Sequence, residues 1–119
     1  MQNLGRNSGM GKMQRDKGAR IERGEVKRFR EAGIYAERVP LSGASKGRRM
    51  GNGHDIDVYI GPDSAPLCGE IKGRKEIPKY IKEWLGENDF LLIKEDRSLP
   101  IVMVPWRTFR DLLKGYRNA

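Results

Sequence analysis

Apolar residues at helical spacing first occur in the segment KGARIERGEVKRFREAG. Val26, Phe29 and Gly33 recur about one helical turn apart, and a glycine directly after the last turn is typical of a helix C-terminus. We therefore predict an amphipathic helix over residues 18–32. Residues 1–16 carry no such period and no aromatic residue, so we expect them to form a flexible, mildly basic arm.

An acidic residue interrupts the apolar stripe of this helix. Glu22 lies one helical turn before Val26, where a buried apolar side chain is expected. Such a conflict indicates either a solvated side chain near the first turn or a functional group.

A short strand over residues 34–39 is followed by a loop, LSGASKGRRMGNG, that is rich in glycine and positive charge. Glycines allow close approach of a ligand, and Lys46, Arg48 and Arg49 supply charge. The loop is therefore either a solvated hairpin tip or a segment that contacts phosphate groups. It is not a nucleotide-binding P-loop, because the Gly-Lys-Ser/Thr ending is absent.

The next segment, HDIDVYIGPDSAPLCGEIKG, has the pattern of a β-hairpin. Ile56, Val58 and Ile60 alternate with polar or aromatic residues, and a Gly-Pro-Asp-Ser turn follows them. We predict strands over residues 56–60 and 66–73.

The predicted register of this hairpin suggests chemistry. Symmetric closure around Asp63 and Ser64 places Asp57 opposite Glu70, with their Cβ atoms roughly 4.5–5.5 Å apart. Two carboxylates at that distance repel each other, and a hard divalent cation relieves the repulsion. Mg²⁺ is the expected ion, with Mn²⁺ as a substitute. Lys72 points the same way along the strand and could stabilise charge on a phosphate, so these are the parts of a metal-dependent phosphodiesterase.

The rest of the chain completes one α/β domain. We predict a helix over residues 78–85, a hairpin of residues 90–94 with 101–104, and a last helix over 106–113. Tyr80 and Trp84 have helical spacing and are expected to pack onto the sheet. The predicted fold is a single domain with a central mixed sheet of about five strands flanked by helices.

Charge and cysteine content narrow the function classes. Twenty-four Lys and Arg residues against sixteen Asp and Glu residues give a net charge of +8, which favours a polyanionic partner, and nucleic acid is the leading candidate. We expect a cytoplasmic protein without a membrane partner, because the sequence has neither a secretory signal nor a membrane-spanning segment. One cysteine, Cys68, and one histidine, His54, exclude an internal disulfide and a Cys/His zinc site. Cys68 is expected to be a small packing residue, and His54 either a general base or a solvated loop residue.

These residues carry a family resemblance. Glu22, Asp57, Glu70 and Lys72 resemble the active site of the PD-(D/E)xK nuclease superfamily, and residues 17–75 are most similar to archaeal-type Holliday-junction resolvases. The resemblance implies a restriction-endonuclease-like core in a nuclease domain over residues 17–119.

The resemblance also implies roles for individual residues. Glu22, Asp57 and Glu70 would be metal ligands and Lys72 the catalytic lysine. The resemblance implies DNA contacts for Arg23, Arg38 and Ser42. The glycine-rich loop adds three basic positions that are expected to contact DNA, Lys46, Arg48 and Arg49. The implied activity is Mg²⁺-dependent hydrolysis of four-way DNA junctions, and the two symmetric cuts require a homodimer.

Two questions stay open at the level of sequence. Asp55 lies two residues before Asp57 on the same face, and the thirteen-residue step to Glu70 favours Asp57. The alternatives to a junction resolvase are a nuclease of the same superfamily that cuts other branched or duplex DNA, and a non-catalytic basic module that binds nucleic acid.

Overall fold

The computed structural model describes residues 3–39 and 53–118, with side chains described over 11–39 and 53–115. The chain divides into two compact units, Met1–Gly73 and Arg74–Ala119. This division falls after residue 73, whereas the sequence suggested a boundary after residue 16. The mixture of helices and strands confirms the α/β class.

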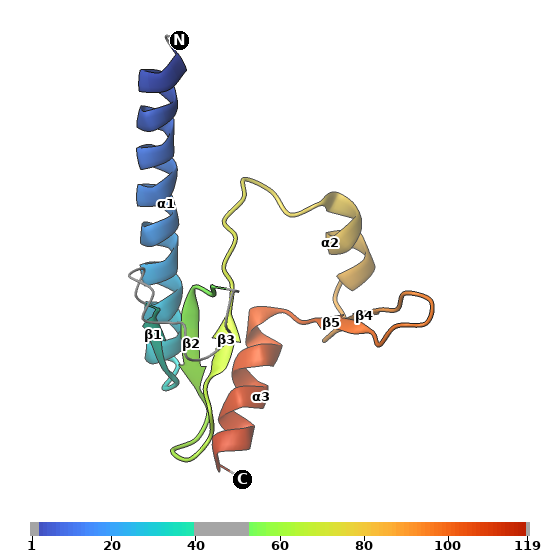
Figure 1. Ribbon diagram of the computed structural model, residues 1–119. Coiled ribbons are helices and arrows are strands. Elements are labelled where there is room, and N and C mark those ends of the chain that lie inside the picture. The colour runs from blue at the N-terminus through green and yellow to red at the C-terminus, as the bar shows by residue number, and fades with distance from the viewer. Residues whose placement is uncertain (1–2, 40–52, 119) are drawn as a thin grey trace. The chain divides into compact units, whose positions relative to one another are not determined.

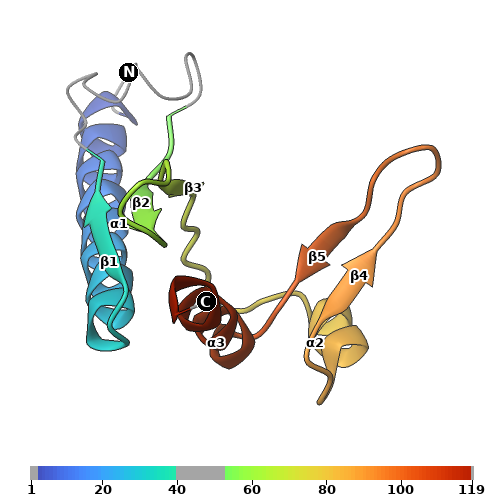
Figure 2. The ribbon, with the colours of Figure 1, turned by 90° about the horizontal axis from the view of Figure 1, so that it is seen from below.

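The first unit is a helix packed on a three-stranded sheet. Its elements are α1 (Asn3–Glu31), β1 (Tyr35–Arg38), β2 (Ile56–Tyr59) and β3 (Leu67–Gly69). The strands are antiparallel in the order β1-β2-β3, so β2 is central, and α1 contacts β1 and β2 (Figures 1 and 2).

The predicted apolar stripe of α1 is confirmed as the face that builds the core. Val26 and Phe29 are buried there, and α1 packs against β1 and β2. The buried apolar side chains of this unit are Val26, Phe29, Ile34, Ala36, Ile56 and Val58.

The glycine that the sequence predicted as a helix end has that role. Gly33 has a φ of 85°, a left-handed conformation that glycine adopts without steric cost. The amide of Gly33 donates to the carbonyl of Arg30, and the amide of Ile34 donates to the carbonyl of Phe29, both at 2.9 Å. This pair of hydrogen bonds is a Schellman motif, which satisfies carbonyls at the helix end and turns the chain into β1.

The predicted start of the helix is wrong. The helix begins at Asn3 rather than near residue 18, so residues 3–16, expected to form a flexible arm, continue it. Hydrophobic periodicity detects only those helical residues that bury a side chain, and residues 12–17 are exposed.

The predicted register of the β2–β3 hairpin is also wrong. Cys68, not Glu70, is the partner of Asp57. The amide of Ser64 donates to the carbonyl of Gly61 at 3.5 Å, which places Pro62 at the second position of a four-residue turn. Proline favours that position because its φ is already near the required value. The turn is therefore centred one residue earlier than predicted, and each residue of β2 meets a partner two positions away from the expected one.

The second unit contains two helices and a hairpin. Its elements are α2 (Lys79–Leu85), β4 (Leu91–Ile93), β5 (Ile101–Met103) and α3 (Trp106–Asn118). The five predicted strands all occur, but β4 and β5 form their own two-stranded antiparallel sheet, so the single mixed sheet predicted from the sequence is wrong for the described residues.

The aromatic residues of α2 also differ from prediction. Tyr80 and Trp84 stack edge to face, with ring centroids 5.1 Å apart, but each is more than half exposed rather than packed onto a sheet. A two-stranded sheet gives a short helix little surface to cover. Across the described ranges, no helix has the length and apolar character needed to cross a bilayer.

The close approach of Gly73, which follows β3, to Ile21 of α1 gives a test of this packing. A Cβ atom added at Gly73 would overlap the Cδ1 atom of Ile21 in α1. Gly73→Val is therefore expected to lower the free energy of unfolding by about 1–3 kcal/mol. Urea denaturation followed by circular dichroism measures the change.

Gly24→Ala is the matched control for this prediction. No described atom outside the backbone of α1 lies within 4 Å of a Cβ at Gly24. Alanine in a helix interior should add about 0.5–1 kcal/mol of stability. Equal effects of the two substitutions would contradict the close approach of residue 73 to α1.

Candidate functional site

Asp55 is held where the central strand begins. Its amide donates to the carbonyl of Gly69 at 2.9 Å, and its carbonyl accepts from the amide of Val39 at 3.0 Å. Its carboxylate oxygen Oδ2 accepts a hydrogen bond from the amide of Ile71 at 2.6 Å. Asp55 is therefore fixed against residues 69–71, the segment that contains Glu70.

Glu70 and Lys72 follow β3 and are open to solvent. Their side chains are 58% and 63% exposed, and Lys72 Nζ lies 3.8 Å from Glu70 Oε2. An ion pair this exposed contributes little to stability, so both groups can reorganise around a ligand at small cost. The structure thus places the predicted catalytic glutamate and lysine together, beside Asp55.

Glu22 lies on the side of α1 that faces β1. Arg38 Nε donates to Glu22 Oε1 at 3.1 Å, and the Glu22 side chain is 19% exposed. The neighbouring residue, Ile21, packs at Gly73, directly after Lys72. The helical turn that carries Glu22 is therefore next to the end of the segment that carries Glu70 and Lys72. The acid on the apolar stripe is explained by its partner Arg38.

Asp57 has different neighbours from those predicted. Its side chain is 10% exposed, and His54 Nε2 lies 2.7 Å from Asp57 Oδ1. A His54 ring nitrogen, an Asp57 carboxylate oxygen and the Cys68 sulfur all lie within 4.8 Å of one another. Among the described residues, neither Glu22 nor Glu70 belongs to this group.

Sequence reasoning overlooked this group because the hairpin register was misplaced by two residues. Placing Pro62 at the second position of the turn would have paired Asp57 with Cys68. We refer to His54, Asp57 and Cys68 below as the HDC cluster.

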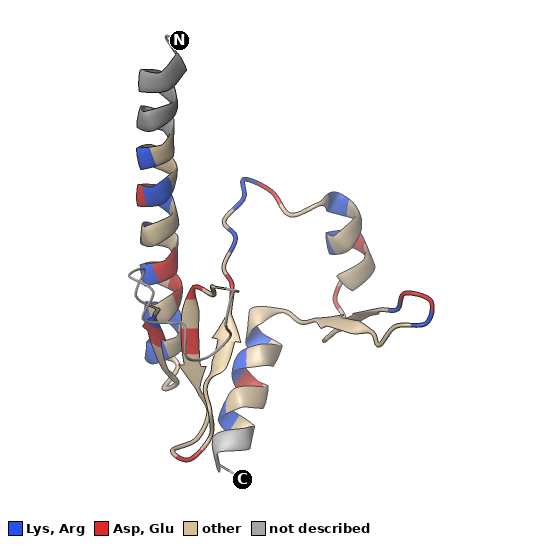
Figure 3. Cartoon of the chain, in the orientation of Figure 1, with Lys and Arg blue, Asp and Glu red and all other residues tan. Residues whose placement is uncertain are grey.

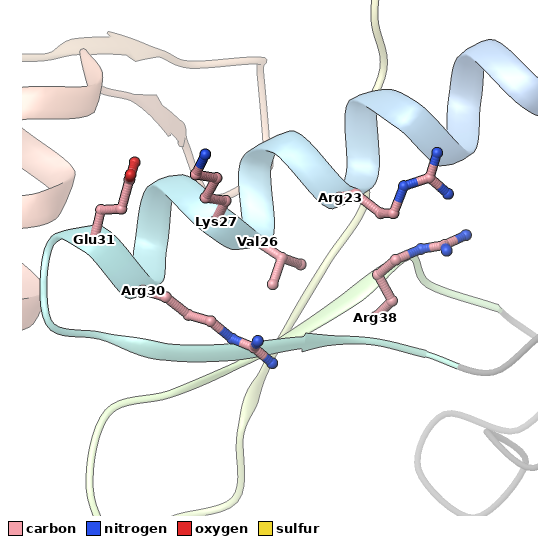
Figure 4. A pocket seen from close by; sticks show the side chains of 6 residues that line it. All are labelled: Arg23, Val26, Lys27, Arg30, Glu31 and Arg38. Carbon is pink, nitrogen blue, oxygen red and sulfur yellow. The ribbon is translucent and has the colours of Figure 1, made fainter.

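A basic pocket of about 560 Å³ lies between α1 and β1 (Figure 4). Two of the predicted DNA-binding residues, Arg23 and Arg38, line it, and Figure 4 shows their guanidinium groups pointing toward the same end. The pocket holds four cationic side chains and one acid, and basic residues are distributed along α1 (Figure 3). Its lining residues are Arg23, Val26, Lys27, Arg30, Glu31 and Arg38.

Lys27 and Arg30 are basic pocket residues that the sequence did not single out. Arg30 has a structural role as well, since its Nε donates to the carbonyl of Ala36 at 2.8 Å and its guanidinium lies 5.1 Å from the ring centroid of Tyr35. Four other predicted DNA-binding residues lie outside the described residues: Ser42, Lys46, Arg48 and Arg49.

The donor atoms decide which residues suit Mg²⁺. Asp55 and Glu70 offer carboxylate oxygens, the ligands that this hard cation prefers, and Glu70 is accessible to solvent and substrate. The HDC cluster instead offers nitrogen, oxygen and sulfur, which suits softer metals. The expected Mg²⁺ site therefore fits Asp55 with Glu70 better than Asp57 with Glu70.

The buried contact between His54 and Asp57 can be tested by substitution. Asp57→Ala leaves a buried ring nitrogen without its partner and is expected to cost about 1–3 kcal/mol of unfolding free energy. Asp57→Asn should cost no more than about 1 kcal/mol, because an amide can donate to or accept from the imidazole. Chemical denaturation of both variants measures the difference, and equal losses would argue against the hydrogen bond.

Comparison with protein-family models, with curated proteins and with solved structures finds no significant match for this chain. The functional conclusion therefore depends on the residues and geometry of the site.

Proposed function

We propose that this protein is a Mg²⁺-dependent endonuclease that hydrolyses DNA phosphodiester bonds, with four-way junctions as its substrate. The observation that carries the proposal is the 2.6 Å hydrogen bond from the Ile71 amide to Asp55, which holds the carboxylate that directly precedes β2 beside Glu70 and Lys72. A helix on a three-stranded antiparallel sheet is consistent with the restriction-endonuclease-like core that the sequence resemblance implies.

Each residue of the candidate site has a role in this proposal. Asp55 and Glu70 would hold the metal through carboxylate oxygens. Asp55 takes the place expected for Asp57, and Glu22, expected as a third ligand, instead pairs with Arg38. When bound, Mg²⁺ neutralises phosphate charge and lowers the pKa of a coordinated water. Lys72 carries its ammonium group 3.8 Å from Glu70 and stabilises the negative charge that develops on the phosphate. Glu22 orients Arg38 through their ion pair.

The basic pocket supplies the DNA contacts. Arg23, Lys27 and Arg38 present cationic groups on the same unit as the carboxylates, and the chain carries a net charge of +8. Contacts of this kind position a nucleic acid by its phosphates without reading its sequence. Junction resolution needs two symmetric cuts, so the proposal includes a homodimer acting on DNA in the cytoplasm.

The proposed activity is tested with a labelled four-way junction and a linear duplex of the same sequence. The protein is incubated with each substrate in Mg²⁺ or in EDTA. We expect paired nicks in the junction that require Mg²⁺ and do not occur in the duplex. Glu70→Gln should lower the rate by at least about 100-fold, because it removes a metal-binding charge.

Asp63→Asn is the matched control, because Asp63 is an exposed carboxylate at the tip of the same hairpin. The Asp63→Asn variant should cleave the junction at the wild-type rate. Equal cleavage of junction and duplex would replace the resolvase with a general DNA nuclease. Junction binding without cleavage in Mg²⁺ or Mn²⁺ would leave a non-catalytic nucleic-acid-binding module.

A further inference from the structure

The HDC cluster joins the two strands of the candidate catalytic hairpin. Asp57 of β2 and Cys68 of β3 are paired across the sheet, and His54 lies just before β2. The side chains of His54 and Asp57 are 7% and 10% exposed, and Cys68 is partly buried. The three donor atoms lie within 4.8 Å of one another.

This spacing is close to that of a bound metal. Ligand atoms in a tetrahedral zinc site are about 3.3–3.8 Å apart, given metal–ligand distances of about 2.0–2.3 Å. The 2.7 Å contact between His54 and Asp57 is a hydrogen bond that an ion would replace. The HDC cluster therefore gathers its three donor atoms at nearly the spacing of a three-ligand site.

The imidazole provides a second, independent observation. His54 Nδ1 is buried and has no hydrogen-bond partner within the described ranges. A buried polar atom without a partner costs free energy, and native structures contain few of them.

We propose that His54, Asp57 and Cys68 bind one zinc-class divalent ion, with an open fourth position. A neutral imidazole, a carboxylate and a thiolate suit Zn²⁺, and the two negative charges balance the charge of the ion inside a partly buried site. A count of only one thiol and one imidazole excluded a zinc site at the level of sequence. That count did not include the carboxylate of Asp57, which β2 supplies as the third ligand.

The proposed ion differs from the Mg²⁺ of the cleavage site in ligands and in position. It joins β2, which follows Asp55, to β3, which precedes Glu70, and so fixes the strands adjacent to those carboxylates. The inference does not depend on nuclease activity.

Cobalt spectroscopy on the full chain without an affinity tag tests this site. Co²⁺ is titrated into the protein, and the absorption of a thiolate–cobalt bond is recorded. Because Cys68 is the only cysteine, that absorption reports on Cys68 alone. We expect saturation at one ion per chain and displacement by Zn²⁺.

Variants assign the other ligands, with circular dichroism confirming their folding. Cys68→Ala should abolish the absorption, and His54→Gln and Asp57→Asn should each weaken binding by at least about 10-fold. Glu70→Gln, the cleavage-site variant, should bind Co²⁺ as the wild type does. This variant separates the two sites, because it should lose cleavage and still show the Cys68–cobalt absorption.

A measurement on the wild-type protein avoids dependence on variants that fail to fold. His54 is the only histidine, so its imidazole nitrogens give a single set of signals in a ¹⁵N NMR spectrum. One nitrogen should shift on addition of stoichiometric Zn²⁺. Absence of both the thiolate absorption and the imidazole shift would overturn the proposal, as would cobalt binding that His54→Gln and Asp57→Asn leave unchanged.

Discussion

The turn at Gly61–Ser64 determines which side chains meet in the candidate site. Pro62 at its second position centres the hairpin on residues 62 and 63, and the pairing of Asp57 with Cys68 follows from that centre. Side chains alternate along a strand, so a turn displaced by one residue changes every cross-strand partner. The chemistry available to this protein depends on that local constraint more than on which acidic residues the sequence contains.

Two carboxylates that look equivalent in the sequence acquire different surroundings from this register. Asp55 accepts a hydrogen bond from the Ile71 amide, beside an exposed glutamate and lysine. Asp57 is largely buried between an imidazole and a thiol. The first environment offers hard oxygen ligands near solvent, and the second offers mixed ligands away from it. One short hairpin thus carries both the carboxylates of the proposed cleavage site and the ligands of the proposed zinc-class site.

Several parts of the fold could be predicted because burial leaves a pattern in the sequence. The stripe of Val26 and Phe29, the glycine at position 33 and the alternation in β2 each have a direct physical signature. The start of α1 has none, because exposed helical residues bury no side chain. The separation of β4 and β5 from the other strands was also hidden, since short strands have the same pattern in either kind of sheet.

The site could be predicted only in part, for the same reason. Glu70 and Lys72 lie together as expected, and Glu22 is explained by Arg38. Residue spacing favoured Asp57, whereas the hydrogen bonds that hold Asp55 against residues 69–71 lie outside the regular ladder and leave no pattern in the sequence. The proximity of His54 and Cys68, fourteen positions apart, follows from the hairpin register, which Pro62 indicates but the symmetric closure around Asp63 and Ser64 misplaced.

The division of roles between the two aspartates is tested most directly by comparing Asp55→Asn with Asp57→Asn in junction cleavage, in buffer that contains Mg²⁺ as its only divalent ion. Both substitutions keep the shape of the side chain and an oxygen that accepts the same hydrogen bond, so they remove only the charge. We expect Asp55→Asn to lower the cleavage rate by at least about 100-fold, and Asp57→Asn to retain it within about threefold. The reverse order would assign the catalytic metal to Asp57 and contradict the site described for Asp55.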